Sequence, residues 1–70
     1  MSVNDVFRER LLSAVKDSGL SMDKIGYLSG YSPNYILRLK NGHMSNPTIS
    51  LVWAVANALD VSPYWLLGED

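Results

Sequence analysis

Two polar side chains near the centre of the chain could read the bases of a nucleic acid. The Asn34 amide can form paired hydrogen bonds with adenine, and the Arg38 guanidinium can do so with guanine. Leu37 could contact a thymine methyl group. On a helix, residues three and four positions apart share one face, so the three side chains would act together. An ordinary solvated helix face is the alternative interpretation.

The helix that would present them is well marked. Ser32 can cap its start, Pro33 suits its first position, and Asn-Gly at 41–42 is typical of its end. Ile36 and Leu39 fall on the inward face. The outward face then carries the candidate base contacts, which are Pro33, Asn34, Leu37 and Arg38.

The glycines before this helix predict a tight connection. Gly26, Gly30 and Ile36 have the spacing that two helices need when they cross through a very short turn. Glycine at position 26 permits close approach of the backbones, and Gly30 supplies the left-handed conformation that residues with a Cβ avoid. The spacing is typical of a DNA-binding helix-turn-helix, although ordinary turns produce it as well.

Helical periodicity and capping residues predict five helices and no strand. Counting the residues that cap or end them, the helices cover 4–19, 21–30, 32–42, 47–60 and 62–68. Ile25 and Leu28 form the expected buried side of the second helix, and Trp53 and Trp65 are expected in the core. The sequence therefore predicts one all-α domain over residues 1–70.

The composition fits a small domain held together by apolar packing. The chain has 70 residues, 47% of them hydrophobic, a mean hydropathy of +0.00 and no cysteine. A single histidine and no cysteine exclude a Cys/His zinc cluster, and scattered acids provide no nucleophile with a positioned base. We expect no enzyme activity, metal, cofactor or small-molecule effector. The sequence shows neither an export signal nor a membrane-spanning run, so a cytoplasmic protein is expected.

The charge distribution is more informative than the net charge of −1. Residues 1–23 sum to −1, residues 24–59 to +3 and residues 60–70 to −3. A basic centre between acidic ends is compatible with one surface that faces DNA, although three cations give weak attraction to phosphate.

The combination of motifs resembles the phage repressor and Cro type of helix-turn-helix domain, the XRE family. The residues that carry this resemblance are Gly19-Leu20-Ser21, Gly26, Gly30, Ser32-Pro33-Asn34-Tyr35-Ile36, Asn41-Gly42, Pro47 and the segment from Ala58 to Gly68. It spans nearly the whole chain and implies a compact five-helix, lambda-repressor-like fold. It also implies a dimeric transcriptional regulator whose third helix enters the major groove of a pseudo-palindromic double-stranded DNA operator. Relatives commonly dimerise near the C-terminal end, here Tyr64, Trp65, Leu66 and Leu67.

The resemblance and the attraction of helix N-termini for phosphate suggest a set of DNA backbone contacts. The candidates are Ser21, Met22, Ser32, Tyr35, Lys40, Asn41, His43 and Ser45. For Tyr35 the alternative is a half-buried side chain packed on the second helix.

Four positions depart from the family pattern. Met22 stands where glutamine is frequent, and His43 stands where lysine or arginine is usual. Val15 and Lys40 replace an arginine and glutamate that many members pair. The Lys40 stem is expected along Val15, with its ammonium group free for phosphate or for Asp17.

Two functions remain in competition. The exposed Asn34, Arg38 and Asn41 favour a sequence-specific transcriptional regulator, most simply a repressor. The weak positive charge and Met22 favour a protein-interaction module of the antitoxin or anti-repressor type that keeps the fold.

Overall fold

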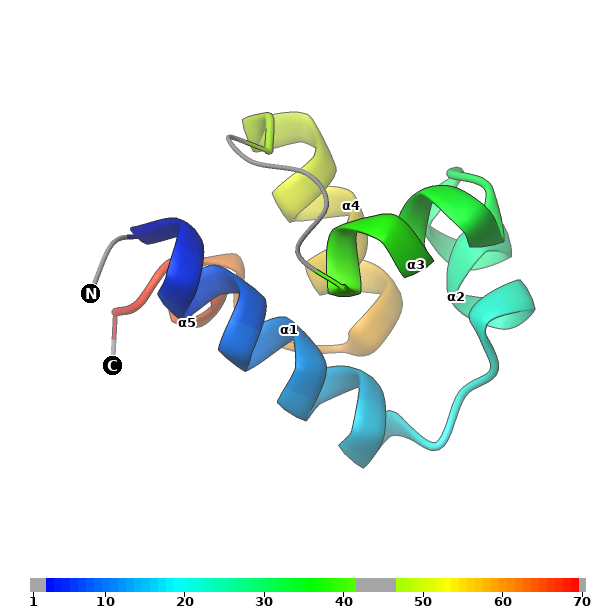
Figure 1. The fold of residues 1–70 in the computed structure, drawn as a ribbon, viewed down its shortest axis with the longest axis horizontal. Coiled ribbons are helices and arrows are strands. Elements are labelled where there is room, and N and C mark those ends of the chain that lie inside the picture. Colours follow the sequence, from blue (N-terminus) through cyan, green and yellow to red (C-terminus); the bar gives the residue numbers. More distant parts are fainter. Residues whose placement is uncertain (1–2, 42–46, 70) are drawn as a thin grey trace.

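The computed structural model describes residues 3–41 and 47–69, which form five α-helices. The helices are α1 (Val3–Ser18), α2 (Met22–Ser29), α3 (Pro33–Lys40), α4 (Ile49–Leu59) and α5 (Pro63–Leu66). α2 and α3 adjoin at one end of the fold, and α5 packs on α1 at the other end (Figure 1). The all-α prediction is confirmed, and the boundaries agree with the predicted ones to within two residues.

Serine or threonine caps the N-terminus of each helix from α2 to α5. The side-chain oxygens of Ser21, Ser32, Thr48 and Ser62 each accept a hydrogen bond from the backbone N–H three residues later. Such caps satisfy amide groups that would otherwise lack a partner inside the helix. These local signals explain why the helix starts could be predicted from sequence.

The core is formed by one cluster of apolar side chains from all five helices. Its largest fully buried side chains are Leu11, Ile25, Ile36, Leu39, Leu51, Val55 and Leu66. Trp53 and Trp65 are half-buried and pack against this cluster rather than lying inside it. Among the described residues, no helix is long and apolar enough to cross a bilayer.

The prediction that Leu28 lies on the buried side of α2 is wrong, because 47% of this side chain is exposed. The buried stripe of α2 runs instead through Ile25 and Gly26. Tyr31 and Pro33 lie so close to Gly26 that this side of the helix must face inward. Leu28 is consequently turned toward solvent.

The close approach at Gly26 sets the position of α3. A Cβ at this residue would lie 2.7 Å from the Tyr31 carbonyl oxygen and 3.1 Å from the Pro33 nitrogen. The Gly26 carbonyl oxygen also accepts hydrogen bonds from the backbone N–H groups of Gly30, at 2.9 Å, and Tyr31, at 3.1 Å. Gly30 adopts the left-handed conformation with φ of 82°, as the sequence predicts.

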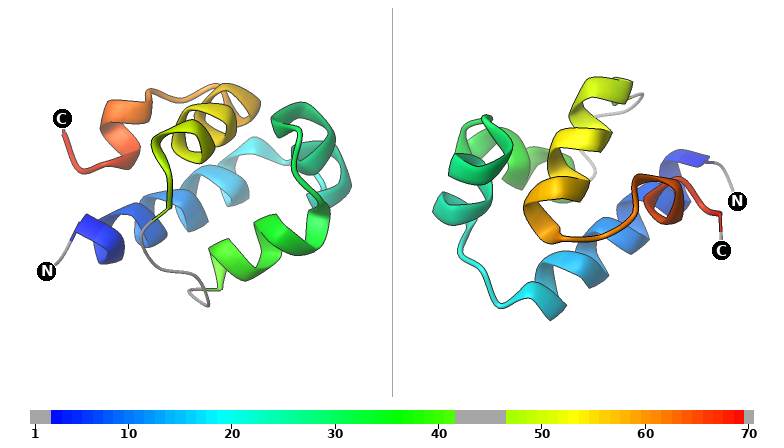
Figure 2. Two further views of the ribbon diagram at one scale, coloured as in Figure 1. Left: turned by 90° about the horizontal axis from the view of Figure 1, so that it is seen from above. Right: turned by 180° about the vertical axis from the view of Figure 1, so that it is seen from behind.

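Arg10 joins the N-terminal helix to the C-terminal segment, a contact that the sequence analysis missed. Its Nη1 atom donates hydrogen bonds to the carbonyl oxygens of Trp65, at 2.6 Å, and Glu69, at 3.0 Å. The guanidinium carbon also lies 5.2 Å from the centre of the Trp65 ring, within range of a cation–π interaction. The first turns of α1 and the segment that contains α5 accordingly lie side by side in all views (Figures 1 and 2).

We expect Gly26→Ala to destabilise the fold. Alanine is favoured over glycine within a helix by about 1 kcal/mol, but the added Cβ would press on backbone atoms that no side-chain rotation can move. Overpacking of this kind lowers the free energy of unfolding by about 1 to 3 kcal/mol. Urea denaturation measures the change, with Ser13→Ala, at an exposed position of α1, as the control. A stabilised Gly26→Ala variant would contradict the close approach.

We also expect Arg10→Ala to lower the free energy of unfolding by about 1 to 2 kcal/mol, because it removes charge-assisted hydrogen bonds and the contact with Trp65. Arg8→Ala is the matched control, since Arg8 is exposed on the same helix and exposed substitutions usually change stability by less than about 0.5 kcal/mol. Thermal unfolding followed by tryptophan fluorescence distinguishes the two variants. Equal stability of both would show that the Arg10 contacts contribute nothing.

Candidate nucleic-acid interface

The outer face of α3 is the candidate contact surface. Asn34, Leu37, Arg38 and Asn41 are all exposed, and Pro33 is half-buried at the start of the helix. On the opposite side, Ile36 and Leu39 are almost completely buried. The predicted division of α3 into an inner and an outer face is therefore confirmed.

The anchoring of α3 makes this face a rigid support. The Ser32 side chain accepts a hydrogen bond from the Tyr35 N–H at 3.1 Å, which fixes the first turn. At the other end, the Asn41 N–H donates to the Leu37 carbonyl oxygen at 3.0 Å. Side chains on a helix held at both ends and along its buried face are positioned more accurately than side chains on a loop.

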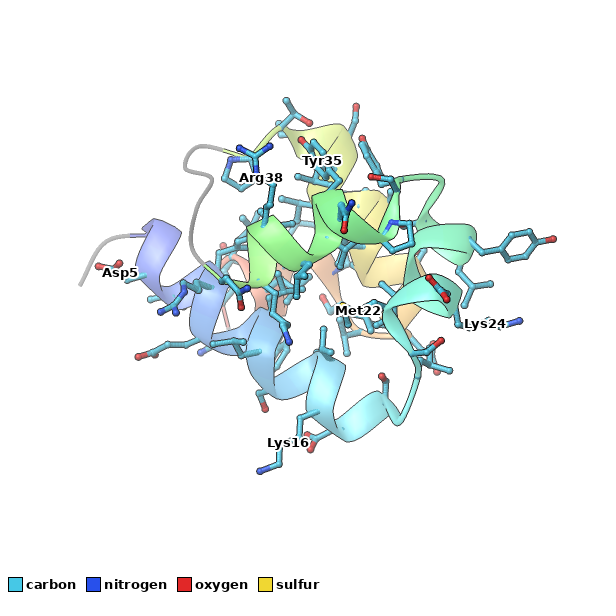
Figure 3. All side chains as sticks on the ribbon, turned by 45° about the vertical axis from the view of Figure 1, so that its right-hand side comes forward. Asp5, Lys16, Met22, Lys24, Tyr35 and Arg38 are labelled. Carbon is cyan, nitrogen blue, oxygen red and sulfur yellow. The ribbon has the colours of Figure 1, made fainter. Side chains whose placement is uncertain are left out.

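Tyr35 lies at the edge of the outer face and is half-buried. Its ring stacks on that of Tyr31, with centroids 5.1 Å apart and planes inclined by 26°. Figure 3 shows Tyr35 and Arg38 on the same side of α3. The stack agrees with the half-buried alternative for Tyr35, although its partner is in the turn before α3. The sequence analysis did not single out Tyr31, and the aromatic pair four positions apart was the available signal.

The N-terminus of α2 presents a second group of candidates. Ser21 is exposed, and its side-chain oxygen caps the helix by accepting from the Lys24 N–H at 3.1 Å. Met22 is half-buried and packs against the core, so its side chain serves to anchor the helix. The free amides of this first turn are the groups that attract phosphate.

Lys24 is an exposed cation on α2 that the predicted contacts did not include. Its ammonium nitrogen lies 5.6 Å from the centre of the Tyr27 ring. Figure 3 shows Lys24 projecting from α2, apart from Arg38 and Tyr35 on α3. Lys24 can add positive charge near α2 but does not share the outer face of α3.

The end of α3 carries the remaining described candidates. Lys40 is half-buried and Asn41 is exposed. Val15 packs against the core, while contact between its side chain and the Lys40 stem stays a prediction. The candidates His43 and Ser45 lie outside the described residues.

This arrangement is suited to direct recognition of base edges. One amide, one guanidinium group and one aliphatic side chain project from the same rigid helix, and each has a matching feature in the DNA major groove. Helices of this diameter fit that groove, whereas the minor groove is too narrow for them.

Comparison with protein families gives a match over most of the chain. A family model described as helix-turn-helix matches residues 11–66, which include all of α2, α3, α4 and α5. No curated protein and no solved structure matched the chain. Since the family match covers well over half of the sequence, this protein belongs to the helix-turn-helix family of the XRE, or phage repressor and Cro, type, a family of DNA-binding domains that are typically not enzymes.

Proposed function

We propose that the protein is a sequence-specific transcriptional regulator, repressor-like in action, that binds double-stranded operator DNA with α3 in the major groove. The observation that carries this proposal is the exposed stripe of Asn34, Leu37 and Arg38 on a helix fixed by buried Ile36 and Leu39. Family membership supports DNA as the partner.

In this proposal each side chain on the outer face of α3 contacts a different base. Asn34 binds adenine through its amide, Arg38 binds guanine through its guanidinium group, and Leu37 packs on a thymine methyl group. Pro33 brings the first turn of α3 close to the bases. Asn34 and Arg38 contribute polar groups and Leu37 an aliphatic one, and the fold leaves all three side chains exposed.

Phosphate contacts would set the register of the protein on the duplex. The groups proposed for this role are the first amides of α2 beside Ser21 and Met22, with Ser32, Tyr35, Lys40, Asn41, His43 and Ser45. Because few of them are cationic, neutral hydrogen bonds would supply much of this contact.

The operator is proposed to be pseudo-palindromic and to be bound by a homodimer in the cytoplasm. Two copies related by a two-fold axis would place their α3 helices about 34 Å apart, one turn of DNA. A protein-interaction module that keeps the fold is the second candidate, favoured by the net charge of −1 and by the core contact of Met22.

We expect Arg38→Ala to weaken operator binding by about 1 to 3 kcal/mol and to remove the preference at one base pair of each half-site. Site selection from a random DNA pool, followed by titration of single-base variants, measures both effects. Lys16→Ala is the control, because Lys16 projects from the end of α1 on the opposite side of the fold from Arg38 (Figure 3). If Arg38→Ala weakens binding to all sequences equally, Arg38 contacts phosphate and not a base.

Titration of random duplex DNA at several salt concentrations tests the choice between the two functions. We expect binding at low salt that weakens as salt is raised. The slope of log affinity against log salt should be no steeper than about −3 for each bound copy of the chain, because each neutralised phosphate contributes about 0.9 and Lys24, Arg38 and Lys40 supply the positive charge of residues 24–59. No binding at low salt would overturn the regulator proposal and favour the protein-interaction module.

A further inference from the structure

Tyr31 lies in the turn between α2 and α3, and the end of α2 holds its backbone in place. Its N–H donates hydrogen bonds to the Gly26 carbonyl oxygen, at 3.1 Å, and to the Ser29 side-chain oxygen, at 3.4 Å. Its own carbonyl oxygen lies against Gly26, only 2.7 Å from where a Cβ on that glycine would be. Tyr31 therefore has a fixed position relative to the start of α3.

The ring of Tyr31 supports the ring of Tyr35. Both side chains are half-buried and pack against the core, and their rings stack with centroids 5.1 Å apart and planes inclined by 26°. This distance is within the range of favourable aromatic pairs. The Tyr35 N–H also donates to the Ser32 side-chain oxygen at 3.1 Å. Tyr35 is thus held both at its backbone and at its ring.

The hydroxyl of Tyr35 is suited to donate a hydrogen bond to a DNA phosphate. A half-buried tyrosine can cover its ring while the polar tip reaches water, and none of the described residues hydrogen-bonds to this hydroxyl. Figure 3 shows Tyr35 on the same side of α3 as Arg38, the side proposed to face the duplex. A phosphate contact is therefore compatible with the stacked, half-buried ring.

The stack matters because a mobile side chain loses rotamer freedom when it binds. A donor that is already held in its bound position avoids most of this cost, and its hydrogen bond then contributes more to affinity. Residues 24–59 supply only three cations, so neutral donors have a large share in setting the register on the duplex. A side chain that orders one of these donors would strengthen DNA binding without contacting DNA.

We infer that Tyr31 is a positioning residue for DNA binding, whose ring holds Tyr35 so that the Tyr35 hydroxyl donates to a phosphate of the operator. The inference rests on the proposed operator-binding function. It adds to that function a residue in the turn that acts through its ring and not through its hydroxyl.

Three substitutions test the inference on a duplex selected from a random DNA pool. Tyr31→Leu keeps an apolar side chain but removes the ring, Tyr31→Phe keeps the ring, and Tyr35→Phe removes only the hydroxyl. We expect Tyr31→Leu and Tyr35→Phe each to weaken binding by about three- to tenfold, and Tyr31→Phe to bind like the unmodified protein. Tyr27→Leu is the matched control, because Tyr27 is 81% exposed on α2 and its loss should leave the affinity unchanged.

Methylphosphonate linkages in the same duplex separate positioning from a general structural effect. Each linkage replaces one charged phosphate oxygen by a methyl group, so it weakens binding where that phosphate is contacted. At one phosphate for each bound copy, this loss should become smaller in Tyr35→Phe and in Tyr31→Leu but persist in Tyr31→Phe, because changes that remove the same interaction are not additive. A mere loss of stability in Tyr31→Leu, measured by urea denaturation, would leave the pattern along the duplex unchanged.

Two results would overturn the inference while specific binding still supports the regulator function. In the first, Tyr31→Leu keeps the full effect of the linkage that Tyr35→Phe makes smaller. In the second, Tyr31→Phe loses this effect, because the Tyr31 hydroxyl would then be the group required. If Tyr35→Phe alters the effect of no linkage, Tyr35 contacts no phosphate and the inference also fails. Failure to select any duplex would instead contradict the regulator function, and the inference with it.

Discussion

The contact between α2 and the start of α3 at Gly26 is the constraint on which the rest of the structure depends. No residue with a side chain fits there, since its Cβ would lie 2.7 Å from a backbone oxygen. The resulting close approach allows one carbonyl oxygen to accept bonds from both Gly30 and Tyr31. A turn of three residues then suffices to connect the helices, and α3 leaves it in one direction. The orientation of α3 is therefore set by the backbone and not by the side chains on its outer face.

Because the orientation of α3 does not depend on its outer side chains, the outer face of this helix is available for recognition. Ile36 and Leu39 hold the helix from inside, and Ser32 holds its first turn. Asn34, Leu37 and Arg38 take no part in the core, so they can be replaced without loss of the scaffold. In the proposed function, base preference would therefore depend on these few exposed groups and would not be determined by the fold alone.

The fold was largely predictable because its signals are local. Capping serines, Pro33 and the left-handed Gly30 mark helix ends through interactions within a few residues, and all behave as the sequence indicates. The failures involve contacts between distant parts of the chain. Leu28 was predicted on the wrong side of α2 because the close packing of Tyr31 and Pro33 on Gly26 determines which side faces inward. The hydrogen bond from Arg10 to the Trp65 carbonyl was missed because the two residues are 55 positions apart. For the candidate site, the outer face of α3 followed from periodicity, while the individual DNA contacts stay predictions.

Because the central part of the chain carries little positive charge, contacts with the bases would contribute more to DNA binding in the proposed function than attraction to phosphate. With three cations in residues 24–59, attraction to phosphate can provide only modest affinity for a single domain. Base contacts from one short helix add a few kcal/mol, so in the proposed function they would supply a large share of the free energy of binding.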